Sequence, residues 1–130
     1  MTRERPEWIL RETVLCLHEQ LLAEFGGAGG IRDEGLLDSA LGRPENLFGY
    51  GQPTLSQLAA SYVFGLVKNH PFVDGNKRIG FAMGALFLQL NGRRLVATEA
   101  DAVLQTLALA AGEIAEDVYA GWLEANSEEM

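Results

Sequence analysis

The segment from Ile79 to Leu90 is apolar on nearly every face of a helix, and this feature constrains the fold most. A helix that is apolar all round has to be buried by its surroundings. The run is too short for the ~20 residues that cross a bilayer, and polar residues flank it within a turn. We therefore predict a buried central helix from Asn76 to Leu90, which Asn91-Gly92 ends. Small residues at 80, 82 and 84 would let a neighbouring backbone come close.

The rest of the chain also predicts helices, with little strand signal. From residue 7 onward, apolar residues recur every three or four positions, which places them on one stripe of a helix. That stripe consists of Leu10, Val14, Leu17, Leu21 and Phe25. Caps and stop signals predict further helices from Asp33 to about Leu41, Thr54 to about Asn69, Thr98 to about Ala111 and Glu113 to about Ala125. We predict an all-α fold, a compact single-domain bundle of about six helices over residues 1–130.

Two short segments interrupt the helical pattern. Residues 94–97 have some extended character, and residues 44–53, PENLFGYGQP, mix turn formers with apolar side chains. We predict that the preceding helix closes at Arg43-Pro44, because proline disfavours helical geometry in the residue before it. An ordered flap from Pro44 to Pro53 would follow, with the apolar side chains Leu47, Phe48 and Tyr50.

Composition excludes several classes of partner and site. The net charge is -8 and the sequence pI is about 4.7, whereas nucleic-acid binding needs clustered Lys and Arg, so we expect no direct nucleic-acid binding. Cys16 is the only cysteine, which excludes a disulfide or thiolate metal cluster within the chain and favours a small packing residue. Residues 1–8 show no signal peptide and no run spans a membrane, so we expect a cytoplasmic location.

A nine-residue run from His70 to Arg78, HPFVDGNKR, gathers more kinds of reactive side chain than any other stretch. It lies between two predicted helices, so it presents unpaired backbone N–H groups at a helix N-terminus, where anions bind. Gly75 permits a close approach of the backbone to a phosphate, and Lys77 and Arg78 add positive charge. The run therefore predicts a site for the phosphates of ATP.

Asp74 and His70 add further chemistry to this run. A carboxylate among phosphate-binding groups is repelled by the ligand unless a cation lies between them, so we assign Asp74 to Mg²⁺. His70 can accept a proton near neutral pH and is the candidate general base, while Asn76 can donate to a phosphate oxygen. Taken singly, the histidine is also compatible with a structural role, the aspartate with a turn and the cations with solvated charges. We expect Phe72 to pack in the core and His18 to be structural.

The run meets the pattern HxFx(D/N)(A/G)NKR at every position, and here the chain resembles the Fic superfamily, specifically its death-on-curing branch, the Doc toxins of bacterial toxin-antitoxin modules. The resemblance extends upstream through HEQLLAEFGGAGGIRDEGLLDSALGRPENLF and downstream to GEIAEDVYAGWLEAN. Most Fic relatives have loops that end in GNGR followed by a second arginine, and they transfer AMP. Here Lys77 stands at the second glycine and Phe81 at the second arginine.

The resemblance implies a helical domain that binds ATP and Mg²⁺ at the motif and transfers part of the nucleotide to a protein hydroxyl. His70 would take the proton from that hydroxyl and Asp74 would hold Mg²⁺. The phosphates would be cradled by Gly75, Asn76, Lys77 and Arg78. Similarity to Doc implies a kinase that phosphorylates a threonine of elongation factor Tu and arrests translation.

The resemblance also implies a small antitoxin whose disordered tail folds beside the active site. The flap would dock the protein target, and its apolar side chains are candidate antitoxin contacts. Two alternatives to the kinase stay open: transfer of AMP to a protein hydroxyl, and a catalytically inactive antitoxin-binding or ligand-binding module.

Overall fold

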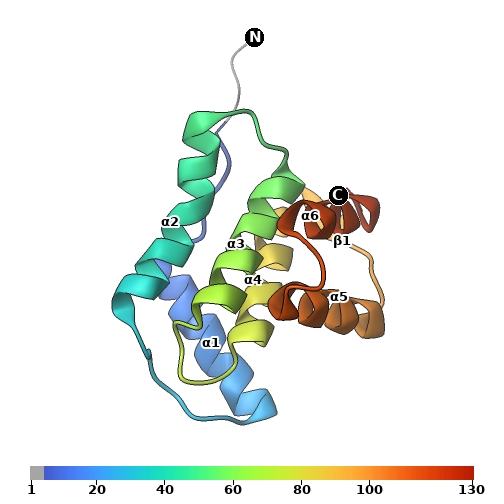
Figure 1. Ribbon diagram of the computed structural model, residues 1–130. Helices are drawn as coiled ribbons and strands as arrows, with labels where there is room; N and C mark the ends of the chain where they lie inside the picture. Colours follow the sequence, from blue (N-terminus) through green and yellow to red (C-terminus); the bar gives the residue numbers. More distant parts are fainter. Residues whose placement is uncertain (1–4) are drawn as a thin grey trace.

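The computed structural model describes residues 5–130, and in this range six helices dominate, which confirms the all-α prediction (Figure 1). The elements are α1 (Arg11–Phe25), α2 (Glu34–Tyr50), α3 (Leu55–Asn69), α4 (Asn76–Leu90), β1 (Arg93–Leu95), α5 (Glu99–Ala111), α6 (Glu116–Ala125) and β2 (Ser127–Glu129). The prediction that residues 1–8 hold no signal peptide concerns residues 1–4 in part, and these four lie outside the described range. Within that range, no helix combines the length and apolar character that crossing a membrane requires.

The helices α3 and α4 form the centre, with α1 and α2 on one side and α5 and α6 on the other (Figure 1). A Cβ at Gly84 would lie 2.6 Å from Cγ2 of Val63, and one at Gly80 would lie 2.9 Å from Cγ1 of Val67. Real Cβ atoms do not come so close, so these two glycines allow α4 to pack against α3. The predicted buried central helix with a close neighbour is confirmed.

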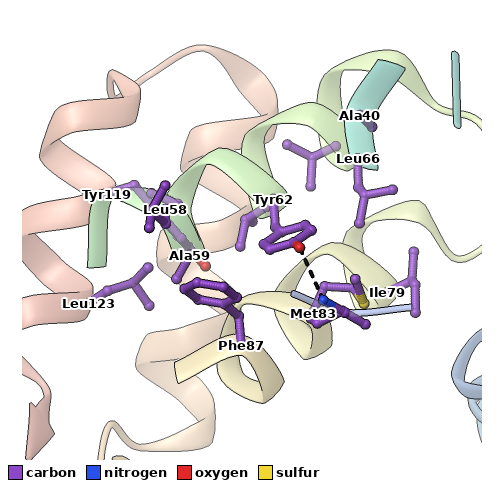
Figure 2. Close-up of a cluster of buried hydrophobic side chains, with 14 of the residues drawn as sticks. Ala40, Leu58, Ala59, Tyr62, Leu66, Ile79, Met83, Phe87, Tyr119 and Leu123 are labelled. Atoms are coloured by element: carbon purple, nitrogen blue, oxygen red, sulfur yellow. Dashed lines mark hydrogen bonds between the residues drawn. The ribbon is translucent and has the colours of Figure 1, made fainter. Parts of the chain in front are cut away.

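Aromatic and aliphatic side chains of α3 and α4 fill the space between the layers (Figure 2). Tyr62 and Phe87 are buried, with ring centroids 5.3 Å apart. The dashed line at the Tyr62 hydroxyl in Figure 2 is the hydrogen bond that it accepts from the backbone N–H of Ile9, at 3.3 Å. Trp8 also stacks on Phe87, with ring centroids 5.8 Å apart. Trp8 and Ile9, which precede α1, therefore contact the core.

The predicted helix end at Pro44 is wrong, and so is the flap. α2 continues through Pro44 to Tyr50, and only residues 51–54 connect it to α3. A proline inside a helix removes one backbone hydrogen bond and costs about 3 kcal/mol. Burial offsets this cost, because Pro44 and Ala40 are buried and Gly65 of α3 lies so close that a Cβ there would be 3.1 Å from Cα of Ala40. Packing against α3 thus overrides the local signal.

The buried face of α1 differs from the predicted stripe. The helix begins at Arg11 rather than near residue 7, and its buried residues are Val14 and His18, while both ends of the stripe are exposed. Cys16 is exposed, so the expectation that it packs in the core is wrong. The reason is geometric: at about 100° per residue, position 16 faces away from a side shared by positions 14 and 18.

After α4, β1 pairs with the last strand, β2, in a short antiparallel sheet. Its register pairs Arg93 with Glu129, Arg94 with Glu128 and Leu95 with Ser127. The sequence pattern indicated extended structure near β1, but β2 is polar and shows no alternation. Arg94 also forms an ion pair with Glu128 at 2.6 Å, so charge complementarity accompanies this pairing. A C-terminal strand of this kind has no apolar signature to predict it from.

Tyr119 predicts how stability responds to alkaline pH. Burial raises the pKa of Tyr119 to about 12, although a hydrogen bond with Thr106 at 2.9 Å opposes the rise. An unfolded tyrosine titrates at about 10, so from about pH 10 to 12 only the unfolded chain releases this proton and stability falls as pH rises. Between about pH 9 and about pH 11, we expect the melting temperature of Tyr119→Phe, measured by calorimetry, to fall less than that of the unmodified chain. Equal losses in both proteins would contradict this.

Candidate functional site

The motif loop, residues 70–75, joins α3 to α4, and the glycine-rich segment 26–32 lies beside it at the lower end of the molecule in Figure 1. Ile31 and Phe72 form an isolated antiparallel bridge. Backbone N–H groups next to this bridge donate across it at 2.7 and 3.1 Å. The segment that borders the motif is therefore the glycine-rich one.

This glycine-rich segment fixes Asp74, the carboxylate assigned to Mg²⁺. Oδ2 of Asp74 accepts a hydrogen bond from the backbone N–H of Ala28 at 2.9 Å. Gly27 has a φ of 123°, and a Cβ there would lie 3.3 Å from Cβ of Asp74, so a glycine suits both the backbone angle and the close approach. Among the described residues Oδ1 has no hydrogen-bond partner, and the side chain is exposed. That oxygen can therefore face a cation.

His70 is exposed and held in an unusual backbone conformation. It caps α3 with φ 49° and ψ 54°, and no other non-glycine residue of the described range has positive φ. This left-handed geometry costs roughly 1–2 kcal/mol, so neighbouring contacts have to maintain it. Arg32 provides them: its Nε donates to the carbonyl of His70 at 2.7 Å and its Nη2 to that of Asn69 at 2.8 Å. No sequence pattern pointed to this role of Arg32, because the contact joins residues 38 positions apart.

Asn76 closes the motif loop with its side chain. Its Oδ1 accepts from the N–H of Phe72 and its Nδ2 donates to the carbonyl of Phe72, both at 3.0 Å. Asn76 is buried, so these bonds satisfy an amide that would otherwise be costly to bury. The side chain predicted to donate to a phosphate is thus engaged within the loop. Phe72 is buried, which confirms its predicted place in the core.

The N-terminus of α4 is open to an anion. Gly75 is the N-cap, with φ 79° and no side chain to cap the helix. Among the described residues, the backbone N–H groups of Asn76, Lys77 and Arg78 have no acceptor. The positive end of the helix and these three amides are the groups that the predicted anion site would use. Both cationic side chains next to it are exposed.

The two cations have different neighbours. The guanidinium of Arg78 lies 4.4 Å from the ring centroid of Phe25, the last residue of α1. Lys77, in contrast, lines a hollow of about 400 Å³ together with His70. The other wall of this hollow comes from α5 and the turn after it: Leu104, Leu107, Ala108, Ala110, Ala111 and Glu113. The hollow therefore has one side with His70 and Lys77 and another that is mostly apolar but includes Glu113.

The residues of the predicted flap lie away from the motif loop. They are at the end of α2, and the 15-residue helix α3, about 22 Å long, separates that end from His70 (Figure 1). Phe48 packs on Trp8 with ring centroids 5.7 Å apart, whereas Tyr50 is 93% exposed. Leu47 lines a second cavity, of about 770 Å³, between the end of α2 and the start of α6. The structure does not bring these three residues together with His70.

The donor set at the motif fits a magnesium triphosphate. Within residues 5–130 no group of three His, Cys, Asp or Glu side chains gathers in a way that could hold a metal ion. One free carboxylate oxygen on Asp74, combined with phosphate oxygens and water, is a common arrangement for Mg²⁺. The uncapped amides of α4, with Lys77 and Arg78, would hold the phosphate oxygens.

Comparison with known proteins identifies relatives over most of the chain. The model of the Fic/DOC family matches residues 8–88, a range that contains α1, α2, α3 and the motif loop. The curated protein "Toxin Doc" of Mycolicibacterium smegmatis is 41% identical over 93 residues, which are 70% of this chain and 69% of that protein. "Protein kinase doc" of Escherichia phage P1 is 32% identical over 104 residues, 79% of this chain and 82% of that protein.

Proposed function

Since this chain belongs to the Fic/DOC family, we propose that it is the toxin of a type II toxin-antitoxin module and acts as an ATP-dependent protein kinase. It phosphorylates a hydroxyl, by resemblance a threonine, of a translation factor such as elongation factor Tu and so arrests translation. The printed names of its two relatives, a toxin and a protein kinase, support this proposal.

One observation carries the proposal: an exposed imidazole, an exposed carboxylate and an uncapped helix N-terminus with two cations lie within nine successive residues, His70 to Arg78. Phosphoryl transfer depends mainly on positioning and on neutralising charge, which such a set provides. In our proposal His70 takes the proton of the target hydroxyl, and the amides of α4 with Lys77 and Arg78 hold phosphate oxygens. Asp74 holds Mg²⁺, and bound Mg-ATP supplies the phosphoryl group.

Transfer of AMP is the second candidate. The apolar wall formed by Leu104 and Leu107 beside His70 favours it, because a nucleoside placed there would bring the α-phosphate near the base. Two other residues favour the kinase. Lys77 brings a charged side chain to the position where the AMP-transferring relatives have glycine, and Phe81, uncharged and partly buried, replaces their second arginine.

We also propose a cognate antitoxin as a partner, with a disordered tail that folds on this protein. The exposed apolar side chains Leu47 and Tyr50 at the end of α2 are candidate contacts, and the 770 Å³ cavity beside them offers room. The net charge of -8 supports a protein partner rather than direct contact with nucleic acid. The proposed place of action is the cytoplasm, where translation factors work.

ATP labelled separately at the α and γ positions tests the reaction. We expect purified protein to transfer only the γ label to elongation factor Tu, and mass spectrometry of the product to show the added mass of one phosphate. Transfer of the α label would instead establish nucleotidyl transfer. If neither label is transferred and a folded sample does not bind Mg-ATP in calorimetry, the protein is an inactive binding module and the proposal is wrong.

A further inference from the structure

His18 of α1 makes two contacts with the motif loop that the proposed roles do not use. The side chain is only 3% exposed, and its ring stacks on Phe72 with centroids 3.8 Å apart. Its Nε2 lies 2.7 Å from the backbone carbonyl oxygen of Asp74, and because a carbonyl only accepts, Nε2 is the donor. A Cβ at Gly75 would lie 3.4 Å from the same nitrogen. One buried side chain thus contacts the loop at two places and leaves little room for a side chain at a third.

The hydrogen bond from His18 fixes the orientation of one peptide group, the one between Asp74 and Gly75. In the described range all peptide bonds are trans, and in a trans peptide the C=O and N–H point in opposite directions. Because the carbonyl points toward His18, the N–H of Gly75 points away from it. No described residue accepts from that N–H. It is therefore a fourth amide donor next to the three of α4.

This orientation needs a restraint because Gly75 is the residue that follows the peptide. Glycine takes positive and negative φ with similar ease, so the peptide before it can rotate at little cost in backbone energy. Rotation would turn the carbonyl of Asp74 outward, where its partial negative charge repels phosphate. We infer that His18 is a positioning residue that holds this peptide with the N–H of Gly75 toward the phosphates. The inference rests on the proposed function only in taking Mg-ATP as the ligand.

Two substitutions separate the hydrogen bond of His18 from its packing. His18→Gln retains a donor nitrogen at a similar reach and loses the ring, whereas His18→Phe retains the stack on Phe72 and loses the donor. For His18→Phe we expect the Kd for Mg-ATP, measured by calorimetry, to rise about ten- to a hundredfold, the range for losing a hydrogen bond to a charged group. For His18→Gln we expect a Kd within about threefold of the unmodified chain. Circular dichroism establishes that each variant is folded.

The backbone amide of Gly75 gives a second measurement that needs no substitution. In ¹⁵N-labelled unmodified protein, Mg-ATP should shift the Gly75 amide resonance as strongly as those of Asn76 and Lys77. Binding with no shift at Gly75, or equal affinities for His18→Phe and the unmodified chain, would overturn the inference. The inference is also overturned if His18→Gln loses as much affinity for Mg-ATP as His18→Phe, because the ring and not the hydrogen bond would then determine the affinity. Absence of Mg-ATP binding by the unmodified chain refutes the proposed function and, with it, the ligand assumed here.

Discussion

Replacing His70 with alanine is expected to lower the rate of transfer to the target protein by a factor of about 10² to 10⁴, the usual loss when a general base is removed. The side chain is exposed, and the one hydrogen bond of its imidazole with residues of the described range is a long contact of 3.5 Å with Nδ2 of Asn76. The loss should therefore appear in kcat rather than in the Kd for Mg-ATP. Transfer of γ-labelled phosphate to elongation factor Tu under saturating ATP measures it.

His70→Asn is the matched control for backbone strain. Position 70 has a φ of 49°, and asparagine adopts this left-handed region more readily than alanine does. Both variants lack the base, so both should lose turnover, while urea unfolding should show His70→Asn to be the more stable of the two. Turnover that stays at the wild-type level in both variants would remove His70 from the mechanism. Turnover lost only in the alanine variant would indicate that strain, and not the missing base, is responsible.

Replacing Phe87 with alanine is expected to lower the free energy of unfolding by about 3 to 5 kcal/mol. Its ring is fully buried and lies 5.3 Å from that of Tyr62 (Figure 2). It also stacks on Trp8 at 5.8 Å, so truncation leaves a cavity where three segments meet. A domain of this size is typically stable by about 5 to 15 kcal/mol, so the variant is expected to be marginally folded. Urea unfolding followed by tryptophan fluorescence and circular dichroism measures the change.

Gln89→Ala is the control for this experiment. Gln89 lies two positions further along the same helix and is exposed, so its replacement should change the free energy of unfolding by no more than about 0.5 kcal/mol. If Phe87→Ala is as mild as this control, α4 is not the centre of the core. Comparing the two variants also cancels any shared effect of alanine on helix propensity.

Helices with strong local signals could be predicted from the sequence. Thr54 caps α3 with the reciprocal bonds to Gln57 that their spacing predicts, Asp33 accepts from Leu36, and Thr98 accepts from Asp101. Each of these bonds joins residues three apart, so the information is present in four successive letters. The apolar character of α4 is similarly local, and it correctly predicted burial. The motif is also continuous in sequence, so its set of reactive groups could be identified without the tertiary structure.

The predictions that failed concern contacts between distant segments. Pro44 is a helix breaker by any local criterion, yet α2 passes through it because its buried face packs on α3. Cys16 has apolar neighbours in sequence, but the rotation of α1 that buries His18 turns it to solvent. β2 carries no strand signal and exists because it pairs with β1.

The sequence by itself determined that the fold is built from about six helices, although not all of their bounds, and which reactive groups occur together between His70 and Arg78. Helix caps, apolar periodicity and a continuous motif are properties of neighbouring residues. Only the tertiary structure decided how these groups are held. Arg32 reaches His70 across 38 positions, Ala28 reaches Asp74 across 46, and His18 reaches the same residue across 56. Such contacts form only when α1 and the glycine-rich segment fold against the motif loop, and no local pattern specifies that arrangement.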